Sequence, residues 1–343
     1  IHSWYGIKYR KYIYISKQIL RIGANKLVMN TEEDIKQKKL MRKSRNKKIR
    51  LYAFLFFLFC YIWARIEYNN IKIKHIVLES SDIPKEFDGK KVVFIADFQM
   101  DTRFNYNRKA VMNAINKVNK IDKDIILLGG DYKVWSDKIP LFYEDLKKLN
   151  KPKFGVYAIL GNHDYDETGD ENKKEYSSDN YYNSANNPNI QNLKSLGYNV
   201  LLNENKEIKI NNDKIYIAGT HDYYSGLADS TQALNGIKKE DFTLLMTHNP
   251  QYYVQGVPES DISRVDLALS GHTHAGQITL FGLFGISPMS MKYWIPYRYG
   301  MKNVKGGKLY ITSGLGGSAF EQYIRFFAQP EIVVIELKKI WKM

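Results

Sequence analysis

Short apolar runs rich in β-branched and aromatic residues recur from Lys91 onward, and they constrain the fold more than any other feature. Stretches with helical spacing, or with Gly and Asp, separate these runs. This alternation is typical of layered α/β architecture, in which sheets pack together and helices cover them. The predicted strands are 92–96, 124–129, 154–160, 214–219, 242–247, 266–270, 309–313 and 331–337. They indicate two packed sheets, with helices expected over 107–121 and 140–149.

A separate apolar run, residues 51–64, follows a basic cluster over residues 42–50. This order matches the charged and hydrophobic regions of a signal sequence. As a helix the run spans about 21 Å, against about 30 Å for a bilayer core, so its length does not settle spanning. Because no small-residue cleavage site follows, we expect an uncleaved anchor; the alternative is a buried core helix. Basic residues on the N-terminal side predict a single-pass protein of the cell membrane with its catalytic domain outside the cytoplasm.

The net charge of +15 lies mostly at the N-terminus. Residues 1–50 hold 15 Lys and Arg against three acidic residues, a net +12 that leaves +3 for the remaining 293 residues. A duplex-binding domain needs a broader basic surface, so we expect no nucleic-acid partner. Residues 1–40 form a basic N-terminal segment. The hypothesis is that Met41 is the natural start and this segment is an upstream extension; the alternative is a cytosolic amphipathic tail.

Polar residues directly follow predicted strands at five places along the chain. In α/β sheets such positions build sites, because strands hold the backbone rigid where their carboxyl ends open on a crevice. Cys60 is the sole cysteine, so a metal here requires His, Asp, Asn or Gln ligands. The five groups are Asp97 with Gln99, Asp131, Asn162 with His163, His248, and His272 with His274. We expect them to converge on one site.

These groups sit in motifs that resemble the calcineurin-like metallophosphoesterase family, in the family's order. The motifs are IADFQ (95–99), GGDY (129–132), GNHD (161–164), THNP (247–250) and GHTHAGQ (271–277). The sequence is most similar to the membrane-associated bacterial branch, also in TSGLGGS and QPEIVVIEL near the C-terminus. The resemblance covers about residues 71–338 and implies a four-layer α/β/β/α sandwich. It leaves residues 41–68 as the basic flank and transmembrane anchor.

The resemblance also implies roles for individual residues, with two divalent cations as cofactors. Asp131 would bridge the cations, Asp97 and His274 would bind the first, and Asn162, His248 and His272 the second. His163 would stabilise the transition state or protonate the leaving oxygen, with Asp164 orienting its imidazole. A metal-bridged hydroxide would be the nucleophile, because bound metals lower the pKa of water.

Gln99 departs from the family pattern, which has His at that position. An amide oxygen is a harder and weaker ligand than imidazole, so Gln99 favours Mn²⁺ or Fe²⁺ over Zn²⁺, or looser binding. Whether Gln99 binds metal directly, through water or not at all stays open. The resulting prediction is metal-dependent hydrolysis of phosphate esters. The alternative is a catalytically silent metal-binding membrane protein.

The expected substrate is a phosphodiester or pyrophosphate, with lipid- or nucleotide-linked envelope precursors as candidates. Arg325 is a candidate phosphate-binding residue, the alternative being an exposed structural arginine. Residues 278–301 are rich in aromatics and Met, which predicts either a cover for the core or a membrane-facing lip. Residues 166–188 have the composition of an exposed loop, and Asp222 is expected to be structural.

Overall fold

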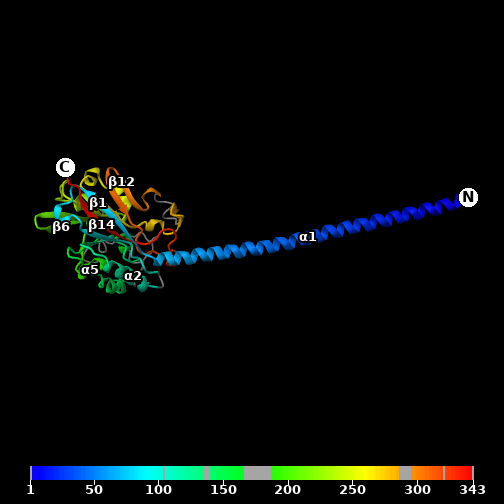
Figure 1. The fold of residues 1–343 in the computed structure, drawn as a ribbon, viewed down its shortest axis with the longest axis horizontal. Helices are drawn as coiled ribbons and strands as arrows, with labels where there is room; N and C mark the ends of the chain where they lie inside the picture. Colours follow the sequence, from blue (N-terminus) through cyan, green and yellow to red (C-terminus); the bar gives the residue numbers. More distant parts are fainter. Residues whose placement is uncertain are drawn as a thin grey trace. The chain divides into compact units, whose positions relative to one another are not determined.

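A computed structural model describes residues 2–102, 105–133, 139–165, 187–285, 295–319 and 321–341. The chain divides into two compact units, residues 1–61 and 62–343. Helix α1 (His2–Asn69) makes up the first unit and contributes its last two turns to the second. The second unit carries all the described strands and all the predicted site residues (Figure 1).

Two six-stranded sheets form the centre of the second unit. In order across the first sheet they are β1 (Lys72–Ser80), β14 (Glu331–Lys339), β2 (Lys91–Ile95), β3 (Ile125–Leu128), β4 (Val156–Ala158) and β5 (Asn199–Val200). In order across the second they are β12 (Gly300–Val304), β13 (Gly307–Ile311), β9 (Leu267–Ser270), β8 (Thr243–Met246), β7 (Asp213–Gly219) and β6 (Glu204–Ile210). Strands β2 to β5 run parallel, as do β7, β8, β9 and β13.

Three apolar clusters show that the second unit has four layers. Alternate residues of each strand face opposite sides, as in every pleated strand. Val92 and Phe94 of β2 face a cluster shared by both sheets, whereas Val93 and Ile95 face the helices. A third cluster covers the outer face of the second sheet. The layers are therefore helix, sheet, sheet and helix, which confirms the predicted α/β/β/α fold.

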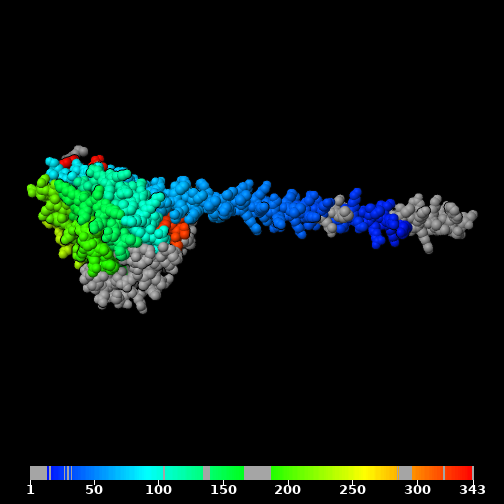
Figure 2. Space-filling view, turned by 90° about the horizontal axis from the view of Figure 1, so that it is seen from below, coloured from blue at the N-terminus to red at the C-terminus, as the bar shows by residue number. Residues whose placement is uncertain are grey.

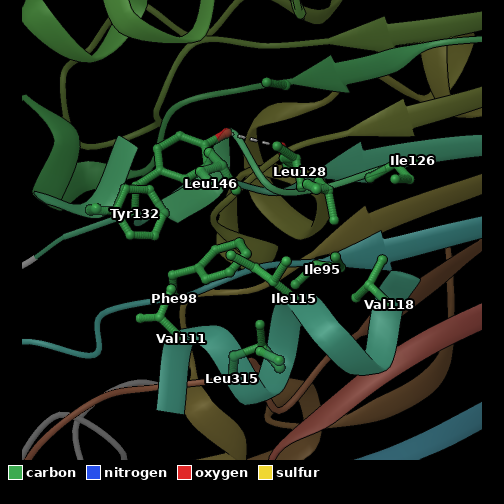
Figure 3. Close-up of a cluster of buried hydrophobic side chains, with 14 of the residues drawn as sticks. Ile95, Phe98, Val111, Ile115, Val118, Ile126, Leu128, Tyr132, Leu146 and Leu315 are labelled. Atoms are coloured by element: carbon green, nitrogen blue, oxygen red, sulfur yellow. Dashed lines mark hydrogen bonds between the residues drawn. The ribbon is translucent and has the colours of Figure 1, made fainter. Parts of the chain in front are cut away.

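The helices lie on the outer faces of the two sheets. On the first sheet are α2 (Arg108–Asn119), α3 (Ile139–Leu146) and α5 (Pro188–Ser195); on the second are α6 (Ser230–Ala233) and α7 (Glu259–Ile262). The Asn107 side chain caps α2 by accepting from the Ala110 amide. Figure 3 shows how the apolar face of α2 meets the residues of the first sheet: Val111 lies beside Phe98, and Ile115 lies beside Ile95.

All eight predicted strands are present, with ends displaced by up to two residues. The prediction missed β1, β5, β6 and β12, and the small hairpin of β10 (Thr279–Leu280) and β11 (Phe284–Gly285). It also placed Pro188, the first residue of α5, in a loop. The predicted loop over 166–186, and residues 286–294 of the aromatic segment, lie outside the described residues.

The apolar run of residues 51–64 lies within α1 and faces outward. Phe54, Phe56, Phe57 and Phe59 are each more than 60% exposed. The helix over Glu33–Asn69 is long and apolar enough to cross a membrane, and only 6% of its most apolar window is buried. A core helix would be largely buried, so the alternative of a buried core helix is not supported. The helix is the candidate membrane anchor.

Candidate metal centre

The carboxyl ends of the parallel strands carry every predicted site residue except Arg325. Asp97 and Gln99 follow β2, and Asp131 follows β3. Asn162 and His163 follow β4, His248 follows β8, and His272 and His274 follow β9. Backbone bonds tie the strand ends together: the Asp97 amide donates to Gly130 and the Gly271 amide to His248. The two sheets thus bring residues from five strands to one edge of the core.

Left-handed backbone conformations concentrate among the predicted ligands. Asp97, Gln99, Asp131, His272 and His274 have φ between +29° and +69°. For residues with a Cβ this region costs free energy, so it persists only where the surrounding fold imposes it. Each strand therefore turns sharply at its end, in a conformation that the fold must hold at some cost.

Two motif glycines lie where a side chain would collide with a carboxylate. A Cβ at Gly161 would meet the Asp131 carboxylate, and one at Gly271 would lie 2.6 Å from Asp97 Oδ2. The glycines of the GNHD and GHTH motifs therefore let neighbouring loops pack directly on the two buried aspartates. Substitution at either position would displace a predicted ligand.

The residues predicted to bind the second metal lie close together. The ligand atoms of Asp131, His248 and His272 lie within 4.8 Å of one another. His248 Nε2 is 3.1 Å from Asp131 Oδ2, and His272 Nδ1 is 2.8 Å from Asn162 Oδ1. Ligands bonded to one ion at about 2.1 Å lie roughly 3 Å apart. These separations suit donor atoms that share a cation.

Two buried polar atoms at the centre lack a hydrogen-bond partner among the described residues: Asp97 Oδ2 and His248 Nε2. His248 Nδ1 lies 2.8 Å from the Gly129 carbonyl, which can only accept, so Nδ1 carries a proton and Nε2 is the nitrogen left to face a cation. Burial acts to lower the pKa of His248, but the carboxylates of Asp131 and Asp97 outweigh it and raise that pKa to about 10, so a bound cation would replace a proton on Nε2. An unpaired buried polar atom is costly unless a ligand uses it. The donor set therefore fits a divalent cation.

Charges at the centre shift the pKa values of its side chains in opposite directions. Burial raises the pKa of Asp97, with the nearby Asp131 adding to the rise and His248 opposing it. Burial also acts to raise the pKa of Asp131, but His248 and His163 outweigh it and the pKa is lowered. Burial, together with the charge of His248, lowers the pKa of His272 to about 3. Asp131 thus stays ionised and His272 neutral, the forms that bind metal.

Gln99 contacts Asp131 through its amide nitrogen. Gln99 Nε2 donates to Asp131 Oδ2 over 2.7 Å, and both side chains are buried. The opposite amide orientation would set two acceptor oxygens against each other. In this conformation Gln99 holds the carboxylate expected to bridge the cations, and only its amide oxygen could serve as a ligand.

Asp164 bonds the backbone around the Asp131 loop. Its carboxylate accepts from the backbone amides of Gly161, Asp131 and Tyr132 at 2.8–3.0 Å. Both oxygens are therefore occupied by backbone donors, and the predicted contact to the His163 imidazole is not among the hydrogen bonds of the described residues. His163 instead donates its backbone amide to Asp131 Oδ1 over 3.0 Å. Asp164 fixes the loop that carries Asp131.

Arg325 is neither exposed nor placed to bind substrate. Its side chain is fully buried and donates to the carbonyls of Gly316, His274 and Ala328. It also lies 3.1 Å from His274 Nδ1. Burial and the charge of Arg325 lower the pKa of His274 well below its ordinary value, which keeps the imidazole neutral. Arg325 therefore positions His274.

Further residues support the loops of the site, although the sequence did not show which contacts they make. Asp222 accepts from the Asn249 side chain over 2.6 Å and so holds the loop after His248, in agreement with its expected structural role. The TSGLGGS segment cradles the first loop: the Gly316 amide donates to Asp97 and the Gly317 amide to Gln99. Backbone hydrogen bonds of this kind cannot be recognised in the sequence, where only the glycines themselves are visible.

Comparison with known proteins is consistent with this site. The family model described as calcineurin-like phosphoesterase matches residues 90–276. An uncharacterized metallophosphoesterase of Bacillus subtilis, YkuE, is 30% identical over 81% of this chain and 90% of its own length. A Danio rerio protein named as a transmembrane protein with metallophosphoesterase domain is 26% identical over 78% of this chain and 57% of its own length. A solved dimetal phosphatase from Danio rerio covers 73% of this chain and 99% of its own, with 11% identity and a TM-score of 0.39.

Proposed function

Because this chain belongs to the calcineurin-like phosphoesterase family, we propose that it hydrolyses phosphodiester or pyrophosphate bonds with two divalent cations, at a membrane surface. The chain is a metal-dependent phosphoesterase. The number of cations, their identity and the substrate belong to the proposal. Mn²⁺ or Fe²⁺ suits a centre in which Gln99 takes the place of a histidine.

The observation that carries the proposal is the convergence of Asp131, His248 and His272, with Asp97 Oδ2 and His248 Nε2 buried and without a hydrogen-bond partner among the described residues. Asp131 is the natural bridge because its Oδ2 already contacts His248. Asp97 and His274 would hold the first cation, and Asn162, His248 and His272 the second. Bound cations neutralise the phosphate's charge and lower the pKa of water.

His163 is the residue we assign to proton transfer. Its backbone is fixed by the bond to Asp131, while its half-buried side chain remains accessible. An imidazole in this position can donate a proton to the leaving oxygen or hydrogen-bond the phosphate in the transition state. Asp164 contributes by holding the loop, and Arg325 by holding His274.

A phosphodiester is favoured because the site's buried arginine is already used. Arg325 donates to three carbonyls and contacts His274, so it offers no free guanidinium to a doubly charged monoester. A diester carries one negative charge and needs less compensation. The exposed apolar part of α1 supports a membrane location, with an outward-facing catalytic domain as the proposed orientation.

A second candidate follows from Gln99. Its amide oxygen is a weaker ligand than the imidazole it replaces, so the first cation would bind weakly. The protein would then be a metal-binding membrane protein without turnover. Metal stoichiometry separates the two candidates: one ion per chain without hydrolysis would favour the silent form.

The test uses the full chain in detergent with Mn²⁺, Fe²⁺ or Zn²⁺, and compares bis(p-nitrophenyl) phosphate with the monoester. Asp131→Asn should lose metal and turnover together. His163→Ala should keep the metal while turnover falls by about 10²-fold or more. Full metal occupancy without diester hydrolysis in the wild type would refute the proposal.

A further inference from the structure

Four large apolar side chains are exposed beside the metal-binding loop. Leu280, Phe281, Leu283 and Phe327 are 40–70% exposed, and we call them the apolar lip. The lip combines the β10–β11 hairpin with the segment before β14. Exposed apolar clusters of this kind mark interaction surfaces in soluble domains.

The lip is an ordered surface held together by specific contacts. The Phe281 and Phe327 rings lie 5.4 Å apart, and Phe327 packs edge-on against Phe326 at 4.7 Å. Thr279 Oγ1 donates to the Phe327 carbonyl and accepts from the Gly282 amide. These contacts join the hairpin to the 326–327 segment, so the four side chains form one surface.

The lip is attached directly to the end of α1, within the same compact unit. The Arg325 amide donates to the Ala64 carbonyl over 3.1 Å. The Glu67 carboxylate accepts from the amides of Phe327 and Ala328 at 3.0 and 2.6 Å. Glu67 also accepts from the Trp63 indole over 3.0 Å. In Figure 2, orange-red chain lies against the light-blue end of α1, in line with these contacts.

These contacts fix the depth of the lip if the apolar run spans a membrane. The run ends at Ala64, so Ala64 then lies at the boundary between hydrocarbon and headgroups. Arg325 is one hydrogen bond away, and Phe327 is two residues further along. Phe and Trp side chains at this level favour the interface. The lip would therefore lie in the headgroup layer.

The same segment is connected to the metal centre. The Gln277 side chain donates to the Ile324 carbonyl, and the Phe326 amide donates to the Gln277 carbonyl. Arg325 reaches the carbonyl and ring of His274. Arg325 thus contacts both His274, a predicted metal ligand, and Ala64, the last residue of the apolar run.

We propose that the apolar lip is a second membrane contact, which holds the metal centre at the headgroup layer so that it acts on phosphates of the bilayer surface. The occupant of the lip is lipid, because the lip is bonded to Ala64 and Glu67, at the end of the apolar run and just after it. This inference rests on the membrane location given under the proposed function. It adds a defined surface and a substrate class, a phosphate ester held in the bilayer.

The first experiment places an environment-sensitive NBD label on the lip of the full chain. Single cysteines are introduced by Phe281→Cys, Phe327→Cys and the control Lys239→Cys, an exposed site on the second sheet's side, each with Cys60→Ser. Each protein is placed in nanodiscs at one copy per disc, with nitroxide-labelled phosphatidylcholine. We expect blue-shifted, quenched emission at Phe281 and Phe327, and water-like emission at Lys239.

Three outcomes would overturn the inference. Water-like emission at both lip positions would show that the lip does not enter the bilayer. The emission is also measured in liposomes that hold many copies of the chain. A blue shift at the lip positions that occurs only there, and not at one copy per nanodisc, would assign the lip to contact with a second copy. Release of the wild-type chain from membranes by alkaline carbonate would show that α1 does not anchor it, and the inference depends on that anchor. Asp131→Asn should keep the same emission, so a failure of hydrolysis remains distinguishable from a failure of the lip.

The second experiment measures catalysis with Phe281→Ser combined with Leu283→Ser. Hydrolysis of soluble bis(p-nitrophenyl) phosphate should stay at the wild-type rate, because neither residue belongs to the metal centre. Hydrolysis of an acylated nitrophenyl phosphodiester in the nanodisc should fall at least about tenfold, since two apolar contacts with lipid are lost. Equal rates on the acylated ester would overturn the inference about substrate.

Discussion

Removing the Asp164 carboxylate tests whether this residue supports the Asp131 loop or orients His163. The carboxylate is fully buried and accepts from the amides of Gly161, Asp131 and Tyr132 at 2.8–3.0 Å. Asp164→Ala leaves all three amides without these bonds. The backbone of Asp131, held at φ +55°, then loses the acceptor of its own amide.

The loss in the free energy of unfolding follows from the three amides that lose their acceptor. Each buried amide without a partner costs about 1–3 kcal/mol, so even the lower limit gives about 3 kcal/mol. At roughly 2–4 °C per kcal/mol for a domain of this size, the Tm should fall by about 6–12 °C. Metal affinity should fall as well, because Asp131 loses its fixed position.

The assay combines thermal unfolding of the full chain with metal analysis. Asp145→Ala is a matched control, because Asp145 is also buried but bonds Arg108, Lys148 and Tyr106 at the helix layer. The control should lower the Tm and leave metal content unchanged. An Asp164→Ala protein with wild-type Tm and metal content but reduced turnover would refute this reasoning and restore the role of orienting His163.

Four further predictions follow from individual contacts. Gln99→His should tighten binding of the more weakly held cation, seen as higher metal content after dialysis; unchanged content would exclude a ligand role at this position. Gly161→Ala should lower metal content and turnover, because the new Cβ meets the Asp131 carboxylate; a variant with the metal content and turnover of the wild type would contradict this packing. Burial lowers the pKa of His221 to about 4 from its ordinary 6.5, so its contribution to stability is present above about pH 6.5 and lost as pH falls toward 4. The Tm of His221→Gln should accordingly fall less than that of the wild type between about pH 7.5 and about pH 5, and equal falls would argue against burial as the cause. Glu67→Ala should lower the Tm and weaken metal binding, since one buried and one partly buried amide close to Arg325 lose their acceptor; loss of stability with intact metal binding would show that the end of α1 does not support the metal centre.

The strands and helices that the sequence predicted are those with the strongest apolar patterns. The missed strands lie at the edges of the sheets or next to them. β6 has the sequence ENKEIKI and pairs only with β7, and β5 has two residues. An edge strand buries little surface, so its composition stays polar and its pattern weak. β1 alternates basic and apolar residues and also lies at a sheet edge.

The sequence by itself determined the family resemblance, the two-sheet fold and the candidate residues of the metal centre, because each predicted ligand directly follows a strand within a short motif. Tertiary structure alone decided the roles of Asp164, Arg325 and Glu67. Asp164 bonds an amide 33 positions away, Arg325 reaches His274 across 51, and Glu67 reaches Ala328 across 261. Such partners are set by how strands and loops pack. A buried charged side chain has the same letter in the sequence as an exposed one.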